Sequence, residues 1–581
     1  RGSPGQNVPP HYGQGSDALV SITLRLPQST KAQHSRAGAG LYYDPPDLDS
    51  NEDYELVIAP PPAESWLAAK SRHGLNRGLE TLLQVLDALA QGQWSEESKG
   101  DSQKHKQGDL MDEKRLWSWG PGHLADGSRQ PVELHIQDAP RFRWRGVMLD
   151  SARHYVPPEA LEHVLSAMAA NKLNVLHWHL TDAVSFPLEL RSLPHLARKG
   201  AFGPNLTYSE ATVRRLVAYA ARLSIRVVPE LDMPAHTASW IFGEPAAVSN
   251  CTHVLPESAE DAANPFKVRD KLALDISKTR SLQVASSVLK EMAGLFPDAY
   301  LHVGGDEVDF RCWVTMPHIR AWMSKHRLSP KLALQRFYDG VFAQLRKLGR
   351  LPVVWQDALE QGLELPEGAA VQPWKCWGAV GGPFVPGWPD NEPPAALGHF
   401  VAFASAASGL GVVQSTCWYL DWDSKWQDFY EHGADEGPLR HGGDSVDPKS
   451  RRSTSSAAGL FGGEVALWTE KIDFTNLDCR LWPRAAAAAE RLWSITPPGP
   501  IARTDVDAGV AARLLVHTRR LQRLHGVSVR PLQSDEGCTS AGGTPAPTLR
   551  ETGPEEPLTA AELADTAATC PLLPSQALQR R

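Results

Sequence analysis

The chain has 581 residues, 42% of them hydrophobic, and a formal net charge of −8. This length and apolar content are typical of a large globular protein with a sizeable buried core. The mild acidic charge offers no basic face for nucleic acid, and without a run of about 18 apolar residues we expect no membrane span.

The first predicted elements form a small α/β unit. Apolar and polar residues alternate over 18–26, and a similar run covers 54–58, as in half-buried strands. Leucines recur at helical spacing between 74 and 90, which predicts an amphipathic helix beside these strands. We therefore expect an accessory domain over residues 1–138, with the polar segment near 93–127 as an inserted loop.

Eight strand-like apolar runs follow, most of them separated by helical segments. Such alternation predicts an α/β fold, a (β/α)8 TIM barrel preceded by the small sheet-plus-helix domain. We place the barrel at 139–535, with an inserted loop near 434–458 and a carboxyl-terminal tail over 536–581. The strand runs are 147–149, 175–180, 226–229, 301–303, 353–355, 371–373, 412–416 and 460–463, and the clearest helices are 158–171, 210–223, 281–295 and 332–348.

Polar or aromatic side chains follow every one of these strands. A single Asp there is often a helix cap and a single Trp is often core, but eight such positions in register favour an active site. Active sites of this fold lie at the carboxyl ends of the strands. The residues are Asp150, Arg153, Asp182, Glu230, Asp232, His236, Asp306, Glu307, Trp355, Trp374, Trp418, Tyr419, Asp421, Trp468 and Glu470.

The sharpest local signal is His302-Val-Gly-Gly-Asp-Glu307. Its glycines allow close backbone approach, and two adjacent carboxylates leave the strand in different directions, so Asp306 and Glu307 can address different atoms of one ligand. A surface Asp-Glu pair is usually only solvated charge. The apolar strand and the Gly-Gly that precede this pair argue for a functional role.

Six collinear motifs resemble those of family 20 glycoside hydrolases, in particular the lysosomal-type β-hexosaminidase subunits of eukaryotes. The resemblance covers residues from about 50 to about 530 and is specific, because the motifs occur in order along the whole barrel. They are Arg145-Gly-Val-Met-Leu-Asp-Ser-Ala-Arg-His-Tyr155, Asn171-Lys-Leu-Asn-Val-Leu-His-Trp-His-Leu180, His302-Val-Gly-Gly-Asp-Glu-Val308, Val353-Val-Trp-Gln356, Trp418-Tyr-Leu420 and Leu481-Trp-Pro-Arg484.

The resemblance implies a retaining exo-β-N-acetylhexosaminidase that releases terminal GlcNAc or GalNAc by substrate-assisted catalysis. In this mechanism the substrate's own acetamide carbonyl attacks the anomeric carbon and forms an oxazolinium intermediate. The resemblance assigns Glu307 as the general acid and later the base, and Asp306 as the carboxylate that orients the acetamide. It implies no cofactor and no metal.

Residues that would bind the sugar follow from the same resemblance. Arg153 and Glu470 would bind hydroxyl groups, and Tyr419 would donate to the acetamide carbonyl. Relatives that accept charged sugars carry Asn-Arg where this chain has Asp421-Trp422. An acidic residue there would repel sulfated or sialylated groups, so we expect a preference for neutral substrates.

Three tryptophans and a polar pair complete the implied site. Trp355, Trp374 and Trp468 would enclose the acetamide methyl and the sugar ring, although each taken singly could be core. Asp182 and His236 would support Glu307 and its protonation.

Seven cysteines are few for this length. The resemblance implies a disulfide between Cys251 and Cys312, and we consider Cys538 with Cys570 as a further pair. Buried free thiols are the default interpretation for the others, Cys376, Cys417 and Cys479.

The chain also carries indications of a secretory protein. Asn205-Leu-Thr and Asn250-Cys-Thr are glycosylation sequons, and the start at Arg1 fits either a removed leader or a boundary within a longer protein. We expect a lysosomal, vacuolar or extracellular location. The expected partners are glycans, glycoproteins or glycolipids ending in N-acetylhexosamine and a second copy of the chain in a homodimer.

Two rival functions remain open. His177-Trp-His179 could hold a metal in an amidohydrolase on a TIM barrel, but packed or hydrogen-bonding histidines are the simpler interpretation. A non-catalytic sugar-binding protein is the other rival. Chelation would test the first, and turnover of a chromogenic N-acetylglucosaminide would test the second.

Overall fold

The structure is a computed structural model, and it describes most of the predicted barrel and accessory sheet. The predicted loop near 434–458 and the tail over 536–581 lie outside the described residues, as does most of the predicted loop near 93–127. The described residues are 22–26, 45–59, 63–90, 122–123, 129–130, 133–251, 272–375, 409–431, 459–494 and 509–532.

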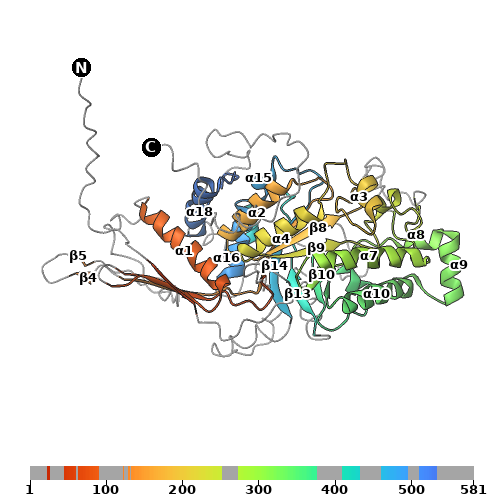
Figure 1. Cartoon of the computed structure of the whole chain (residues 1–581), viewed down its shortest axis with the longest axis horizontal. Helices are drawn as coiled ribbons and strands as arrows, with labels where there is room; N and C mark the ends of the chain where they lie inside the picture. Colours follow the sequence, from red (N-terminus) through yellow and green to blue (C-terminus); the bar gives the residue numbers. More distant parts are fainter. Residues whose placement is uncertain are drawn as a thin grey trace, which may run out of the picture. The chain divides into compact units, whose positions relative to one another are not determined.

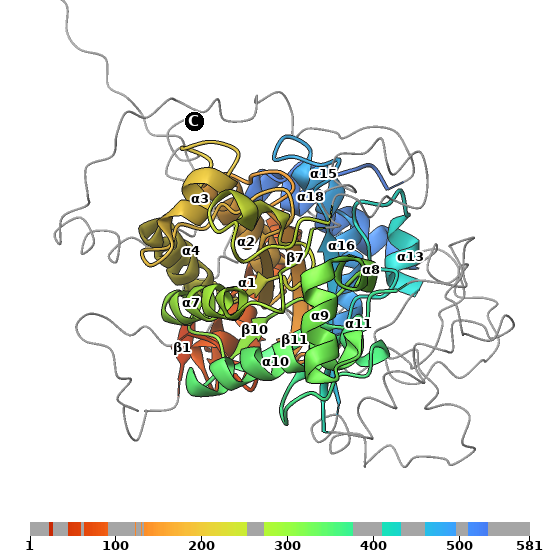
Figure 2. The ribbon, with the colours of Figure 1, turned by 90° about the vertical axis from the view of Figure 1, so that its right-hand side faces the viewer.

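Eight parallel strands close into a barrel in the order β10-β11-β12-β13-β14-β7-β8-β9, and all eight predicted runs belong to it. The strands β7 and β8 are buried along their whole length, because helices cover the barrel on its outer side. Figure 2 shows α4, α7, α10 and α16 around the central strands. The strands are β7 Trp144–Asp150, β8 Val175–Thr181, β9 Arg226–Leu231, β10 Tyr300–His302, β11 Leu351–Trp355, β12 Ala370–Gln372, β13 Gly411–Gln414 and β14 Leu460–Leu467.

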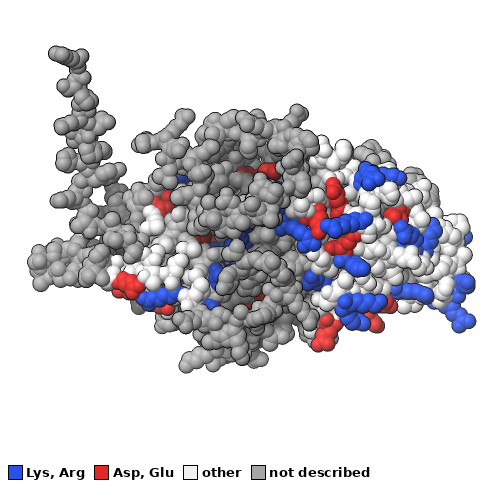
Figure 3. Space-filling model, in the orientation of Figure 1, with Lys and Arg blue, Asp and Glu red and all other residues white. Residues whose placement is uncertain are grey.

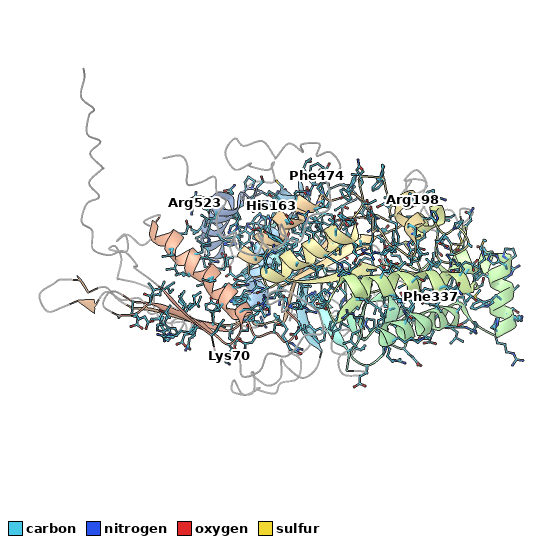
Figure 4. The ribbon with its side chains drawn as sticks, in the orientation of Figure 1. Lys70, His163, Arg198, Phe337, Phe474 and Arg523 are labelled. Carbon is cyan, nitrogen blue, oxygen red and sulfur yellow. A yellow bond between two sulfur atoms is a disulfide. The ribbon has the colours of Figure 1, made fainter. Side chains whose placement is uncertain are left out.

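The predicted helices are confirmed to within a few residues at each end. Helix α10 illustrates why they form: Ser329 caps its first turn by accepting from the backbone N–H of Leu332, and Pro330 follows at the first helical position. Phe337, labelled in Figure 4, belongs to the buried face of this helix. The helices are α2 Pro158–Ala170, α3 Pro194–Gly200, α4 Glu210–Arg222, η2 Ala238–Phe242, α7 Thr279–Leu295, α8 Phe310–Thr315, α9 Pro317–His326, α10 Pro330–Lys347, α11 Asp357–Glu360, α13 Trp426–Glu431, α15 Leu477–Leu481, α16 Arg484–Trp493 and α18 Ala511–His525.

The interior of the barrel is filled by side chains, as in other barrels of this size. Every strand contributes one residue to a single apolar cluster there. Its members are Trp144, Val175, Val228, Tyr300, Val353, Ala370 and Val413, with Phe461 packed against them.

A four-stranded sheet precedes the barrel in sequence, with strand order β1-β3-β2-β6. Strand β2 is antiparallel to both neighbours, and α1, Arg72–Ala90, lies across one face of the sheet (Figure 1). The predicted sheet with a helix is confirmed, whereas β3 and β6 were not predicted, although β6 is as long as β2 and alternates in burial. The strands are β1 Thr23–Arg25, β2 Tyr54–Ile58, β3 Trp66–Ala69 and β6 Leu134–Asp138, and a separate pair consists of β4 Gly122–His123 and β5 Arg129–Gln130.

Helix α16 joins this sheet to the barrel. Trp493, its last residue, packs in the apolar core of the sheet and donates its indole N–H to Asp138 at 2.9 Å from Oδ1. The first residue of this helix, Arg484, donates hydrogen bonds to the carbonyls of Trp422 and Leu420 in the segment after β13.

The cysteines differ in part from the sequence-based expectation. Cys251 and Cys312 form a disulfide with a Cα–Cα distance of 5.3 Å, which ties the segment after η2 to α8. Cys417 and Cys479 are each disulfide-bonded, so the expectation of free thiols is wrong for these two residues. The reason is that pairing depends on proximity in the fold, which spacing along the chain does not reveal. Cys376, Cys538 and Cys570 lie outside the described residues.

The mixture of charges on the surface agrees with the mild net charge of the chain. On the described part of the face in Figure 3, basic and acidic side chains lie side by side. Within the described ranges, no helix is long and apolar enough to cross a membrane.

A buried carboxylate, Glu52, links the sheet segment to the barrel. It accepts hydrogen bonds from Arg77 at 2.7 Å, from Asn174 at 2.8 Å and from Arg145. Burial raises the pKa of Glu52, but Arg145 and Arg77 lower it more, and the result is about 2. Since the folded pKa lies below the ordinary 4.5, the charge of Glu52 stabilises the fold above that value and ceases to do so as the pH falls through about 2.

We expect Glu52→Gln to lower the free energy of unfolding at neutral pH by about 3–5 kcal/mol, because it leaves two buried guanidinium groups without their anion. Chemical denaturation measures the loss. The matched control is Glu64→Gln, which removes an exposed ion pair with Arg25 and should leave the melting temperature unchanged. Equal stability of the two variants would contradict the prediction.

Candidate active site

Side chains that follow five different strands meet at the carboxyl end of the barrel. His236, after β9, lies 3.5 Å from Oδ2 of Asp182, 3.6 Å from Oδ2 of Asp306 and 3.5 Å from Oε2 of Glu307. Asp182, after β8, in turn lies 2.8 Å from Arg153, which follows β7. Arg153 is 4.0 Å from Glu470, which follows β14. The structure therefore brings together these predicted residues from distant parts of the chain.

The backbone before the two acids adopts a conformation that requires glycine at both positions. Gly304 and Gly305 have φ of +65° and +104°, and a Cβ on Gly304 would lie only 1.7 Å from Oδ1 of Asp232. Glu307 itself has φ of 50°, a conformation that non-glycine residues rarely adopt and that occurs often at functional sites. The two acids end up in different surroundings: the side chain of Asp306 is 11% exposed and that of Glu307 is 47% exposed.

Burial and charge give Asp306 an unusual proton affinity. Burial raises its pKa most; His236 lowers it, while Asp357, Glu307 and Glu230 raise it, and the result is about 7. The neighbouring Asp232 has a pKa well above its usual range, first because of burial and then because of Asp306. Both carboxyl groups therefore hold a proton more readily than an exposed aspartate does, and the pKa of Asp306 lies near neutrality.

His236 is the positive partner of these carboxylates. Burial lowers its pKa, but Asp182, Asp232 and Asp306 raise it well above its usual range. The imidazole is consequently a cation between the carboxyl end of β8 and the acid pair after β10, and it can hold both sides in place.

Arg153 is fixed before any ligand binds. Its guanidinium pairs with Asp182, lies 3.5 Å from Oδ2 of Asp150 and sits 4.8 Å from the ring centroid of Trp468. Glu470 opposite is exposed. A rigid planar donor facing a carboxylate acceptor is suited to neighbouring hydroxyl groups.

The three predicted tryptophans differ in exposure. Trp355 is 1% exposed and donates its indole N–H to Oε1 of Glu230 at 2.8 Å, so it forms the floor of the site. Trp468 and Trp374 are half-buried and keep part of their rings open. Trp468 lies 5.9 Å from Trp355, and Trp374 donates to Oδ2 of Asp357 at 2.7 Å.

A loop after β13 supplies Tyr419 and Asp421. Tyr419 is buried and stacks on Trp422 at 4.8 Å, and its pKa is raised well above its usual range by burial and then by Asp421, Asp306 and Glu307, so the phenol remains a donor. Burial, followed by the charge of Glu470, raises the pKa of Asp421 to about 7.

Arg484 at the start of α16 holds this loop. Its Nη1 donates to the carbonyl of Trp422 at 2.6 Å and its Nη2 donates to the carbonyl of Leu420. Arg484 ends one of the sequence motifs, but the motif did not predict this contact, and no pattern predicted the contacts of Asp357 and Lys375 beside Trp374. An arginine that opens a run of alanines in a buried helix is a signal that could have indicated it.

Three groups of buried histidines and carboxylates are close enough together to be considered as metal ligands: His177, Glu230 and His302; His179, Asp182 and Asp232; and Asp232, His236 and Asp306. The nitrogens of His177 face Glu464 at 2.7 Å and Glu230 at 3.0 Å, and those of His179 face Glu230 and, at 3.1 Å, Asp182. Three of these four ring nitrogens hydrogen-bond to carboxylates, whereas Nε2 of His177 lies near Glu230 without a hydrogen bond. This geometry favours the interpretation as hydrogen-bonded core histidines over the amidohydrolase rival.

Comparison with known proteins points to one family. The model of the glycosyl hydrolase family 20 catalytic domain matches residues 142–382 and 395–496. β-Hexosaminidase subunit A1 of Dictyostelium discoideum is 35% identical over 380 residues, 64% of this chain and 62% of that protein, so the match spans less than two thirds of its length. β-Hexosaminidase subunit beta of Felis catus is 32% identical over 84% of this chain and 76% of that protein. Among solved structures, a chitobiase of Flavobacterium johnsoniae aligns with a TM-score of 0.61 and 28% identity, covering 83% of this chain and 61% of that one.

Gly304→Ala and Gly349→Ala form a matched pair, since φ is +65° at one glycine and +66° at the other and a Cβ at Gly349 would meet no atom within 4 Å. We expect Gly349→Ala to cost only the left-handed backbone, about 1 kcal/mol, and Gly304→Ala to cost at least ~2 kcal/mol more because Asp232 must move. Urea unfolding measures both. Equal losses would mean that Asp232 is not what requires a glycine.

Proposed function

Since the chain belongs to glycosyl hydrolase family 20 and is a glycoside hydrolase of the β-N-acetylhexosaminidase type, we propose that it is a retaining exo-enzyme that removes terminal GlcNAc or GalNAc by substrate-assisted catalysis. The observation that carries the proposal is the pair of adjacent acids beside His236, one buried and one open to solvent. Such a pair can serve two different atoms of one sugar.

In the proposed first step, Glu307 donates its proton to the glycosidic oxygen as the bond from that oxygen to the anomeric carbon breaks. The acetamide carbonyl oxygen bonds to the same carbon and forms the oxazolinium ring. Asp306 accepts a hydrogen bond from the acetamide N–H and offsets the positive charge that develops there. Because the attacking group is held within the substrate, its effective molarity can reach about 10⁵–10⁸ M.

In the second step, the Glu307 carboxylate takes a proton from a water molecule that attacks the anomeric carbon. The ring opens, the acetamide is restored, and the product keeps the β configuration. The exposed position of the Glu307 side chain supports this role, since both the departing alcohol and the water must approach from solvent.

The remaining residues would select and orient the sugar. Arg153 and Glu470 bind hydroxyl groups at the rim, and Tyr419 donates to the acetamide carbonyl. The tryptophans provide apolar faces for the methyl group and the ring. Asp182 acts through His236 and Arg153, with which it is paired. The residues proposed as the enclosing box are Trp355, Trp374 and Trp468.

We also propose that the protein resides in an oxidising, secretory compartment, whether lysosome, vacuole or extracellular space, and acts as a homodimer. The disulfides support the compartment, because such bonds persist where glutathione does not reduce them. Asn205 and Asn250 are both exposed, as glycan acceptors must be. The homodimer rests on the family resemblance alone.

The central test of the mechanism uses two substrates and one variant. The protein should hydrolyse a chromogenic N-acetyl-β-glucosaminide with retention, and the analogue with a 2-hydroxyl in place of the acetamide should be turned over at least ~10⁴-fold more slowly. Glu307→Gln should lower kcat by about 10²–10⁴-fold with an unchanged melting temperature. An inverted product, or equal turnover of the two substrates, would refute substrate assistance.

A second test concerns Asp421. At a pH above about 7, where Asp421 is ionised, we expect the native protein to prefer the neutral N-acetylglucosaminide over its 6-sulfated form by at least ~10-fold in kcat/KM, because the sulfate would meet the Asp421 and Glu470 carboxylates. Asp421→Asn should reduce the ratio of kcat/KM for the neutral substrate to kcat/KM for the sulfated one, mainly through a lower KM for the sulfated substrate. Comparable native turnover of the two substrates would overturn the assignment.

A further inference from the structure

Trp374, which we propose as a wall of the site, is held by hydrogen bonds to residues that follow β11. Its indole N–H donates to Oδ2 of Asp357 at 2.7 Å, and its backbone N–H donates to Oε1 of Gln356 at 2.7 Å. The same amide oxygen accepts from the backbone N–H of Lys375 at 2.9 Å. The carboxyl ends of β11 and β12 are thus joined through Trp374.

The other oxygen of Asp357 faces the opposite way, toward the acid. Oδ1 lies 3.5 Å from the backbone N–H of Glu307, the residue with the left-handed backbone. The same oxygen lies 3.0 Å from Nζ of Lys375, which also pairs with Glu360 one turn later in α11. One buried carboxylate therefore contacts both the wall of the site and the backbone of the proposed acid.

Asp357 is also a source of negative charge for Asp306. It raises the pKa of Asp306, as Glu307 and Glu230 do, while His236 lowers it; Asp232 and the phenol of Tyr338 also face this group. Burial raises the pKa of Asp357 itself, and Lys375 lowers it, so the ammonium offsets the charge that reaches Asp306.

We propose that Asp357 and Lys375 are a positioning pair for hydrolysis: Asp357 holds the ring of Trp374 and the backbone of Glu307, and it presents to Asp306 a buried negative charge that Lys375 offsets. This inference rests on the roles proposed above for Trp374, Glu307 and Asp306. Asp357 itself touches no reacting atom.

The two members of the pair predict opposite shifts in the pH profile of kcat/KM. The acidic limb follows Asp306, which must be ionised to receive the acetamide N–H. Asp357→Asn keeps an acceptor for Trp374 but removes the charge, so the limb should move to lower pH. Lys375→Met exposes Asp306 to the full charge of Asp357, so the limb should move to higher pH. Each shift should be on the order of one pH unit, and the double variant should lie between them.

Two further variants distinguish the positioning role of Asp357 from the effect of its charge. Asp357→Ala also removes the acceptor for Trp374, so it should raise KM about 10-fold over Asp357→Asn. Asp339→Asn removes a carboxylate from the exposed face of α10 and should leave the limb in place.

Each possible result of the pH-profile experiment either supports or contradicts the positioning pair. Shifts of the same sign, or no shift, in Asp357→Asn and Lys375→Met would overturn the positioning pair, while retention by the native protein would leave the proposed mechanism intact. If Asp357→Asn does not fold, Lys375→Met still tests the pair, because loss of the ammonium that offsets Asp357 should raise the pKa of Asp306 and move the limb to higher pH, and an unmoved limb would overturn the pair. Loss of retention in the native protein would instead refute the mechanism itself.

Discussion

The candidate active site depends on one buried imidazole among carboxyl groups. His236 lies within 3.6 Å of Asp182, Asp306 and Glu307, and Asp232 is a fourth carboxyl group within its electrostatic reach. Carboxylates at the end of a barrel strand repel one another and lose hydration when they are enclosed. A protonated imidazole relieves both effects, which allows one acid to remain buried beside another that is open to solvent.

The barrel beneath keeps this arrangement rigid. Glu230 contacts His179 and His302 and accepts from the indole of Trp355, so a layer of paired polar groups separates the site from the apolar interior. Buried ion pairs of this kind contribute little net stability, but they define which way each side chain points. Apolar residues from every strand below them supply the packing. The site therefore gains its geometry from the polar layer and its stability from the layer underneath.

Sequence patterns predicted the barrel well, because each of its strands is an apolar run that the chain must bury. They predicted the small sheet only in part: β3 and β6 were not predicted, and both pair with β2 in the structure. The candidate residues were recognisable from their positions after the strands, and their individual roles came from the family resemblance. What could not be predicted are contacts between segments: the pairing of Asp357 with Trp374, the hold of Arg484 on the carbonyls of Leu420 and Trp422, and the bonded state of Cys417 and Cys479. Each of these contacts depends on which loops lie close together in the fold, and the local periodicity of the sequence does not indicate this.

Helix α16 has a guanidinium at one end and an indole at the other, and the two ends belong to different parts of the protein. Trp493 is seated in the core of the small sheet and bonded to Asp138, whereas Arg484 grips the loop that bears Tyr419. The helix is a strut roughly 15 Å long. We therefore expect damage to the small sheet to displace Tyr419, the residue proposed to bind the acetamide, so that a change far from the site lowers enzymatic activity.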